Sequence, residues 1–84
     1  FMMLQNYPNP ANPSTTIRYE LPKAATVTLQ VFNTLGQRVA TLVKGEKEAG
    51  VHQVQWSANV PSGIYFYRLH AGDYIQTKKM TLMK

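Results

Sequence analysis

Apolar and polar side chains alternate along much of the chain. In residues 15–21 and again in residues 25–32, an aliphatic or tyrosine side chain occupies every second position, and mostly polar side chains fill the positions between. Because successive side chains of a β-strand point to opposite faces, the pattern predicts two strands that each bury one face. Pro22 ends the first strand, since proline has no backbone N–H for a neighbouring strand.

Residues 37–43 carry their apolar side chains in adjacent pairs instead of alternate positions. This spacing fits a strand with a β-bulge about as well as a short helical turn, and we expect the strand. A tight turn at residues 33–36 precedes it, in which Gly36 can adopt the positive φ that such a turn demands. Residues 44–50, which contain two glycines and four charged side chains, are predicted to form a loop.

Two further apolar runs, residues 51–56 and 64–69, flank residues 57–63, which are rich in turn formers. This arrangement is typical of an antiparallel β-hairpin. The second run is apolar on both faces near its start, which indicates a central strand. Trp56 is the only tryptophan, and we expect it at the centre of the core because aromatic side chains bury roughly 150–250 Å².

Tyr65 and Tyr67 share one face of the second run, and two interpretations of Tyr65 remain open. Its hydroxyl can bond to the backbone a few residues upstream, as in the tyrosine corner of immunoglobulin-like sandwiches. Alternatively, Tyr65 is a boundary aromatic with a hydrated hydroxyl.

The two ends of the chain differ in pattern. Residues 1–14 contain three prolines and are predicted to form an extended lead-in and the end of a linker, and residues 15–84 to form the β domain. In the last run, residues 74–83, Met80 and Leu82 share a face and Ile75 points away unless a bulge intervenes, so the pattern leaves open which face of this strand is buried. Six to seven short strands with turn formers between them indicate an all-β antiparallel sandwich.

Composition narrows the function classes. An 84-residue chain forms one small domain with little room for a deep cleft, and the absence of cysteine excludes disulfides and thiolate chemistry. The net charge of +5 favours anionic partners, but the basic residues are scattered, which argues against nucleic-acid binding. No apolar run is long enough to span a bilayer or to serve as a signal peptide.

Side chains capable of catalysis are few. His52 and His70 have no acidic neighbour at a spacing that suggests a relay or a metal pair, and the carboxylates lie in turns or apart from one another. We therefore expect no catalytic site, no metal and no cofactor. Four aromatic side chains can either stack on a sugar, as in a carbohydrate-binding module, or pack against the core: Tyr7, Tyr19, Phe66 and Tyr74.

Five ordered sequence blocks resemble the C-terminal sorting domains of the type IX secretion system and the immunoglobulin-like module of the flagellar hook-capping protein. The blocks are residues 4–17, 31–37, 49–56, 62–69 and 78–84. The family-motif positions within them are Asn6, Tyr7, Pro8, Asn9, Pro10, Asn12, Pro13, Gly36, Gly50, Trp56, Gly63, Tyr65 and Tyr67. Ala11 departs from the phenylalanine usual in the family, which would loosen the packing of the lead-in, and the acidic residue often found after the tryptophan is missing.

The resemblance implies an immunoglobulin-like or fibronectin-III-like sandwich at the C-terminus of a larger secreted protein, often a hydrolase. An outer-membrane translocon would recognise this non-catalytic domain, and a sortase-like peptidase would remove it and often join the cargo to an anionic surface lipopolysaccharide. The implied location is the surface or exterior of a Gram-negative bacterium, reached through the periplasm. We expect a monomer; the alternative function is an accessory carbohydrate- or protein-binding module.

The last strand is the predicted recognition element, because a partner can add a strand to an exposed edge. Its candidate residues are Lys78, Lys79, Met80, Leu82 and Lys84. An equally favoured interpretation is that the lysines only keep an edge strand from aggregating.

Overall fold

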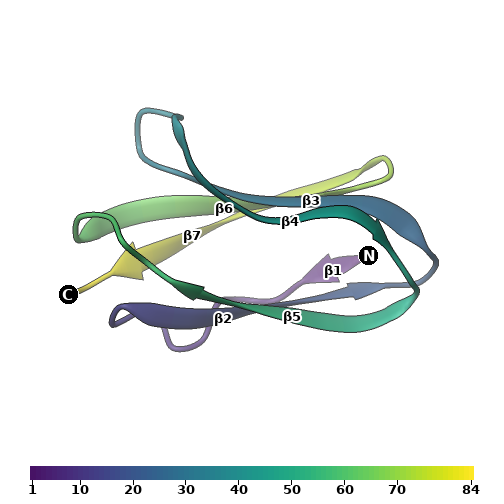
Figure 1. Cartoon of the computed structure of the whole chain (residues 1–84), viewed down its shortest axis with the longest axis horizontal. Coiled ribbons are helices and arrows are strands. Elements are labelled where there is room, and N and C mark those ends of the chain that lie inside the picture. Colours follow the sequence, from purple (N-terminus) through teal and green to yellow (C-terminus); the bar gives the residue numbers. More distant parts are fainter.

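The computed structural model describes residues 1–84, which form seven β-strands and no helix. The strands are β1 (Met2–Met3), β2 (Ser14–Leu21), β3 (Ala25–Phe32), β4 (Arg38–Lys47), β5 (Gly50–Ser57), β6 (Gly63–Ala71) and β7 (Tyr74–Leu82). Their antiparallel pairing produces a three-stranded sheet, in the order β1-β2-β5, and a four-stranded sheet, in the order β4-β3-β6-β7. Figure 1 shows the two sheets as two layers, with β2 and β5 opposite β3, β4, β6 and β7. The predicted immunoglobulin-like sandwich of six to seven strands is confirmed.

The predicted hairpin between residues 51–56 and 64–69 is wrong. β5 pairs with β2, whereas β6 lies between β3 and β7 in the other sheet. Residues 58–62 therefore cross from one sheet to the other, as the connections of a Greek-key sandwich do. Alternation identifies which face of a strand is buried but not which strand lies beside it. The central position predicted for β6 is confirmed.

β4 is a strand with irregular pairing, as its paired apolar residues predicted. Its register against β3 shifts twice, between Leu29 and Gln30 and between Val31 and Phe32. A bulge lets adjacent residues point to the same side, which explains the apolar pairs. The loop predicted at residues 44–50 is wrong, because β4 continues to Lys47 and only Glu48 and Ala49 connect it to β5. The loop was predicted from the charged side chains of residues 44–48, but most of these side chains lie on β4, at the edge of its sheet.

The hairpin of β6 and β7 is regular along its whole length. Gly72 adopts φ 59° at the first position of its two-residue turn, which suits glycine in a type II′ hairpin. The ladder runs from Ala71 opposite Tyr74 to Gly63 opposite Leu82 without a bulge. Ile75 consequently faces outward and Leu82 faces the core.

The core lies between the sheets, and its largest wholly buried side chains are Tyr19 and Tyr67. Trp56 is buried as expected but not central: at 8 % it is the most exposed member of the core, near one end of the β2–β5 ladder. Its ring packs edge-on against Tyr65, with centroids 6.2 Å apart. The Tyr65 hydroxyl donates a hydrogen bond to the Pro61 carbonyl oxygen at 2.6 Å, so Tyr65 forms a tyrosine corner.

The segment before β2, residues 1–13, packs on the sandwich, and we call it the N-terminal strap. Its β1 pairs with β2 at the edge of the three-stranded sheet. Further along, Ala11 forms a parallel bridge with Leu82 at the edge of the four-stranded sheet. The strap therefore joins the two sheets along one side of the molecule, and Met3 and Ala11 belong to the core.

Candidate functional site

The predicted recognition residues all lie on β7 or just after it, but only some of them reach the surface. Met80 and Leu82 are 0 % and 1 % exposed, because both point between the sheets. Lys79 and Lys84 are exposed and Lys78 is half-buried. A partner that approaches the folded domain can therefore contact the lysines but not the side chains of Met80 and Leu82.

The outer edge of β7 is covered at its C-terminal end by the strap. The backbone N–H of Ala11 donates to the Thr81 carbonyl oxygen at 2.8 Å, and the Met83 N–H donates to the Ala11 carbonyl oxygen at 2.8 Å. The Thr81 N–H donates to Asn9 Oδ1 at 3.2 Å. These bonds show that odd-numbered residues of β7 direct their backbone groups away from β6. The last part of the edge is therefore already occupied.

The strap leaves the first part of the β7 edge free. Gln5 Nε2 donates to the Lys79 carbonyl oxygen at 2.9 Å, and no strap hydrogen bond reaches the β7 backbone before Lys79; the Met3 N–H donates only to the side chain of Gln76, at Oε1, 3.1 Å away. Ile75 and Thr77 also direct their backbone groups outward, by the same alternation, and form no such contact. The accessible part of the predicted recognition strand thus combines two unpaired residues with the neighbouring Lys78 and Lys79.

A buried asparagine organises the strap. Asn6 is 2 % exposed, and its Nδ2 donates to Thr15 Oγ1 at 3.1 Å and to the Pro8 carbonyl oxygen at 3.2 Å. Gln5 Nε2 donates to Asn6 Oδ1 at 2.7 Å. The Thr15 hydroxyl also donates to the Pro8 carbonyl oxygen, at 2.9 Å. Since buried polar groups are costly unless they are paired, this network fixes the path of the strap.

The network continues into the core through Tyr67. The Asn6 backbone N–H donates to the Tyr67 hydroxyl at 2.8 Å, and that hydroxyl donates to the Leu4 carbonyl oxygen at 3.2 Å. Burial raises the pKa of Tyr67 above its ordinary value of 10.0, and the hydrogen bond from Asn6 partly opposes this rise. A central strand of one sheet thus holds the strap by a neutral tyrosine.

The remaining motif positions are structural or exposed. Pro13 accepts a hydrogen bond from the Ala58 N–H at 3.2 Å, and Asn12 lies on the surface. Pro8, Asn9 and Pro10 are exposed on the strap, and Gly36, Gly50 and Gly63 adopt positive φ at the turn before β4 and at the first residues of β5 and β6. Ala11 is 0 % exposed, and none of the three surface depressions opens beside it.

Tyr7 is the exception among the motif residues. Its backbone N–H and carbonyl oxygen both bond to Thr16, at 2.9 and 2.8 Å, yet its side chain is 80 % exposed. The backbone of Tyr7 therefore serves the fold and its ring does not.

The histidines and the aromatics lie apart. His52 Nε2 lies 2.7 Å from the Glu48 carbonyl oxygen and its ring stacks on Tyr19, whereas His70 is on the exposed face of the other sheet. No group of three or more histidine and carboxylate side chains could hold a metal ion. Of the four aromatics considered for sugar stacking, Tyr19 is buried, Tyr74 stacks on Phe1, and Tyr7 and Phe66 belong to different sheets. They form no shared platform.

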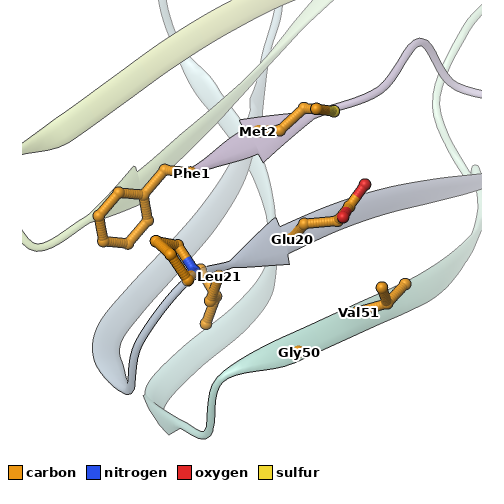
Figure 2. Close-up of a pocket in the computed structure, with 7 residues that line it drawn as sticks. Phe1, Met2, Glu20, Leu21, Gly50 and Val51 are labelled. Carbon is orange, nitrogen blue, oxygen red and sulfur yellow. The ribbon is translucent and has the colours of Figure 1, made fainter.

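The surface is hollowed only shallowly. A depression of about 250 Å³ lies where β1, β2 and β5 meet, lined by Phe1, Met2, Glu20, Leu21, Pro22, Gly50 and Val51. Figure 2 shows how these side chains lie around it. Glu20 is its only charged side chain, so no set of polar groups converges on a bound substrate. The structure contains no helix with the length and apolarity that a membrane crossing requires.

Sequence reasoning missed the polar residues that hold the strap and the C-terminal residue Lys84 in place. Gln5, Thr15 and Ser62 are ordinary polar residues in the sequence, but Thr15 is buried and Ser62 Oγ accepts the Lys84 N–H at 3.0 Å. The only available signal was the position of Thr15, which lies two residues before Ile17. By alternation it shares the buried face with Ile17, Tyr19 and Leu21, but the prediction assigned it to neither face.

A protein-family model covers both the strap and β7. A model described as a secretion system C-terminal sorting domain matches residues 5–83. No curated protein and no solved structure matches the chain. The match includes the strap from Gln5 onward and every candidate recognition residue except Lys84.

Proposed function

Because the chain belongs to the family of secretion system C-terminal sorting domains, we propose that it acts as a non-catalytic export signal that the outer-membrane translocon recognises in its folded form. The family match over residues 5–83 is the observation that carries this proposal. The cargo would cross the periplasm of a Gram-negative cell and reach the surface or the exterior, where a sortase-like peptidase would remove the domain and join the cargo to an anionic surface polysaccharide.

The geometry supports recognition of a surface instead of chemistry in a pocket. Lys79 and Lys84 are exposed near one end of the sandwich, and Lys78 is half-buried beside them. Met80 and Leu82 hold this end in place from inside. In the proposed signal, the lysines and the free part of the β7 edge contact the partner, and the two apolar residues keep that edge in its folded position.

The export of a fusion protein tests the proposal. Residues 1–84 are placed behind a periplasmic reporter in a host that has the type IX system, and the reporter is measured outside the cell. Deletion of residues 78–84 should abolish export. Because that deletion also removes Met80 and Leu82, a second variant, Lys79→Glu with Lys84→Glu, changes only exposed charges and should reduce export while the fold remains.

The control is the reversal of two exposed charges elsewhere, Arg18→Glu with Lys23→Glu, which should leave export unchanged. Equal export of the intact and truncated fusions would exclude the sorting role. Loss of export in the control alone would assign recognition to the three-stranded sheet.

A further inference from the structure

Each sheet of the sandwich has two edges, and three of the four are protected against pairing with another chain. β1 is only two residues long, and the rest of the strap, which contains three prolines, follows it. β7 carries three strap hydrogen bonds to its backbone and the lysines 78 and 79. β4 shifts register twice and displays Arg38, Lys44 and Glu46. Short edges, bulges and charges are the usual means of preventing edge-to-edge association.

β5, the fourth edge, has none of these features. It has eight residues, a continuous register against β2, no proline and no Lys, Arg, Asp or Glu. Val51 is 53 % exposed at its start. An edge of this kind is a template for another extended strand.

The alternation of β2 shows which backbone groups of β5 are free. Thr16 and Arg18 direct their backbone groups toward the strap, where they bond to Tyr7 and Leu4. The backbone groups of the alternate residues of β2, Thr15, Ile17 and Tyr19, must therefore face β5. Their partners in β5 face back toward β2, which leaves the backbone groups of Val51, Gln53 and Gln55 pointing away from the sheet. None of these three takes part in a backbone bond outside the ladder.

The same side of the sandwich is also incompletely closed. We call the side between β4 and β5 the open side, in contrast to the strapped side between β1 and β7. Val39, Leu42 and Val43 of β4 and Val54 of β5 pack against the core here but remain half-buried. An apolar margin next to an unpaired edge favours a partner that brings both a strand and apolar side chains.

We propose that the β5 edge is a self-association surface, at which a second copy of the chain adds its own β5 in antiparallel orientation about a two-fold axis at Gln53. Val51 would face Gln55 of the second copy, and Gln53 would face its own equivalent. The two three-stranded sheets would become one continuous six-stranded sheet. The sequence alone leads to the expectation of a monomer, and this proposal departs from it without depending on the sorting role.

A second copy suits this edge because the strand is complementary to itself. The symmetric register places no charge opposite a like charge, and it brings two identical apolar margins together, as a two-fold interface requires. The net charge of +5 on each copy is spread along the chain, and β4, which borders the open side, carries Glu46 as well as Arg38 and Lys44.

Sedimentation equilibrium of residues 1–84 over a wide concentration range tests the proposal, together with amide hydrogen exchange. We expect reversible dimers, and we expect exchange at Val51, Gln53 and Gln55 to slow as concentration rises. Gln53→Lys and Gln53→Glu should each weaken association at least about tenfold, because each places like charges opposite one another. A mixture of the two variants should restore association as a heterodimer.

Thr77→Lys, at an exposed position of β7 on the strapped side and away from the proposed interface, is the matched control and should associate like the unaltered chain. Circular dichroism establishes that the Gln53 variants fold, since this side chain is exposed and forms no hydrogen bond. A chain that stays monomeric overturns the proposal, and so do dimers that the Gln53 variants do not weaken. Protection of the three amides only when a cargo protein is attached would assign the edge to the cargo and also overturn it.

Discussion

The strapped side and the open side of the sandwich differ in how completely their inward-facing side chains are covered. On the strapped side, Met3, Ala11, Met80 and Leu82 are 2 % exposed or less. On the open side, inward-facing residues of the two edge strands such as Leu42 and Val54 remain half-buried, and Trp56 is the one residue of these two strands that is buried. Two short sheets cannot cover both of their shared sides, so an additional segment is needed. In this chain the family motif supplies that segment on one side only.

The chemistry of the strap explains why its motif is rich in asparagine as well as proline. Proline supplies no backbone N–H, so a segment with three prolines cannot form a regular ladder with β7. The side chains of Asn6 and Asn9 provide the missing hydrogen bonds instead. The comparison of the two sides therefore indicates that the motif stabilises the fold.

The largest expected difference between the two sides is in the cost of removing a leucine. Leu82→Ala should lower the free energy of unfolding by about 2–5 kcal/mol, because Leu82 is 1 % exposed and its removal leaves a cavity. Leu42→Ala removes the same atoms on the open side and should cost about 1 kcal/mol, since water already reaches this side chain. Urea denaturation measures both values.

Equal losses for the two leucine variants would contradict the comparison, because they would mean that the open side is as well packed as the strapped side. Ile75→Ala is the control for a change on the same strand as Leu82. Ile75 is 58 % exposed, so this substitution should change stability by less than about 0.5 kcal/mol.

A smaller effect is expected where the strap enters the core. Tyr67→Phe removes the hydroxyl that accepts the Asn6 N–H and donates to the Leu4 carbonyl oxygen, and it should cost about 1–3 kcal/mol because both partners lose a buried bond. The same variant should also change the response to alkali. Thermal unfolding at a series of pH values measures both effects.

The direction of the pH effect follows from the pKa of Tyr67, which burial raises above 10.0. Above about pH 10 an unfolded tyrosine loses its proton whereas folded Tyr67 keeps it, so the folded state binds more protons and stability falls as pH rises. Tyr67→Phe should make this fall shallower. Tyr19, whose pKa burial also raises, should account for part of the remaining slope. A slope identical to that of the unaltered chain would show that the Tyr67 hydroxyl ionises equally in both states.

Much of the fold could be predicted from the sequence, because alternation reports directly on buried faces. Ile17, Val27 and Leu29 are all buried as their positions predicted. Pairing between strands could not be read in the same way. β5 and β6 are neighbours in sequence and have complementary patterns, yet they belong to different sheets, because burial on one face places no constraint on which strand supplies the hydrogen bonds.

The sequence placed the candidate recognition residues on the last strand but did not show how accessible they are. The resemblance pointed to β7, and Met80 and Leu82 were correctly placed on one face, but the sequence did not reveal that a proline-rich segment more than 70 residues away in the chain occupies the same edge. The contacts of Asn6 with Thr15 and Tyr67 depend on how that segment turns. Such contacts arise from three-dimensional proximity and leave no local pattern.

The smallest expected effect concerns Gln5, which links the strap to the β7 backbone. Gln5→Ala removes the bonds from Gln5 Nε2 to the Lys79 carbonyl oxygen and to Asn6 Oδ1, and their loss should cost about 1 kcal/mol. Global unfolding would barely register this change, but hydrogen exchange at Thr81 and Met83 would, because their N–H groups bond to strap residues Asn9 and Ala11. If the strap detaches locally before the sandwich unfolds, exchange at both amides should accelerate about two- to fivefold. Unchanged exchange would mean that the strap and the sandwich open together. The two sides of the molecule would then differ in packing, but the strap would not unfold as a separate unit.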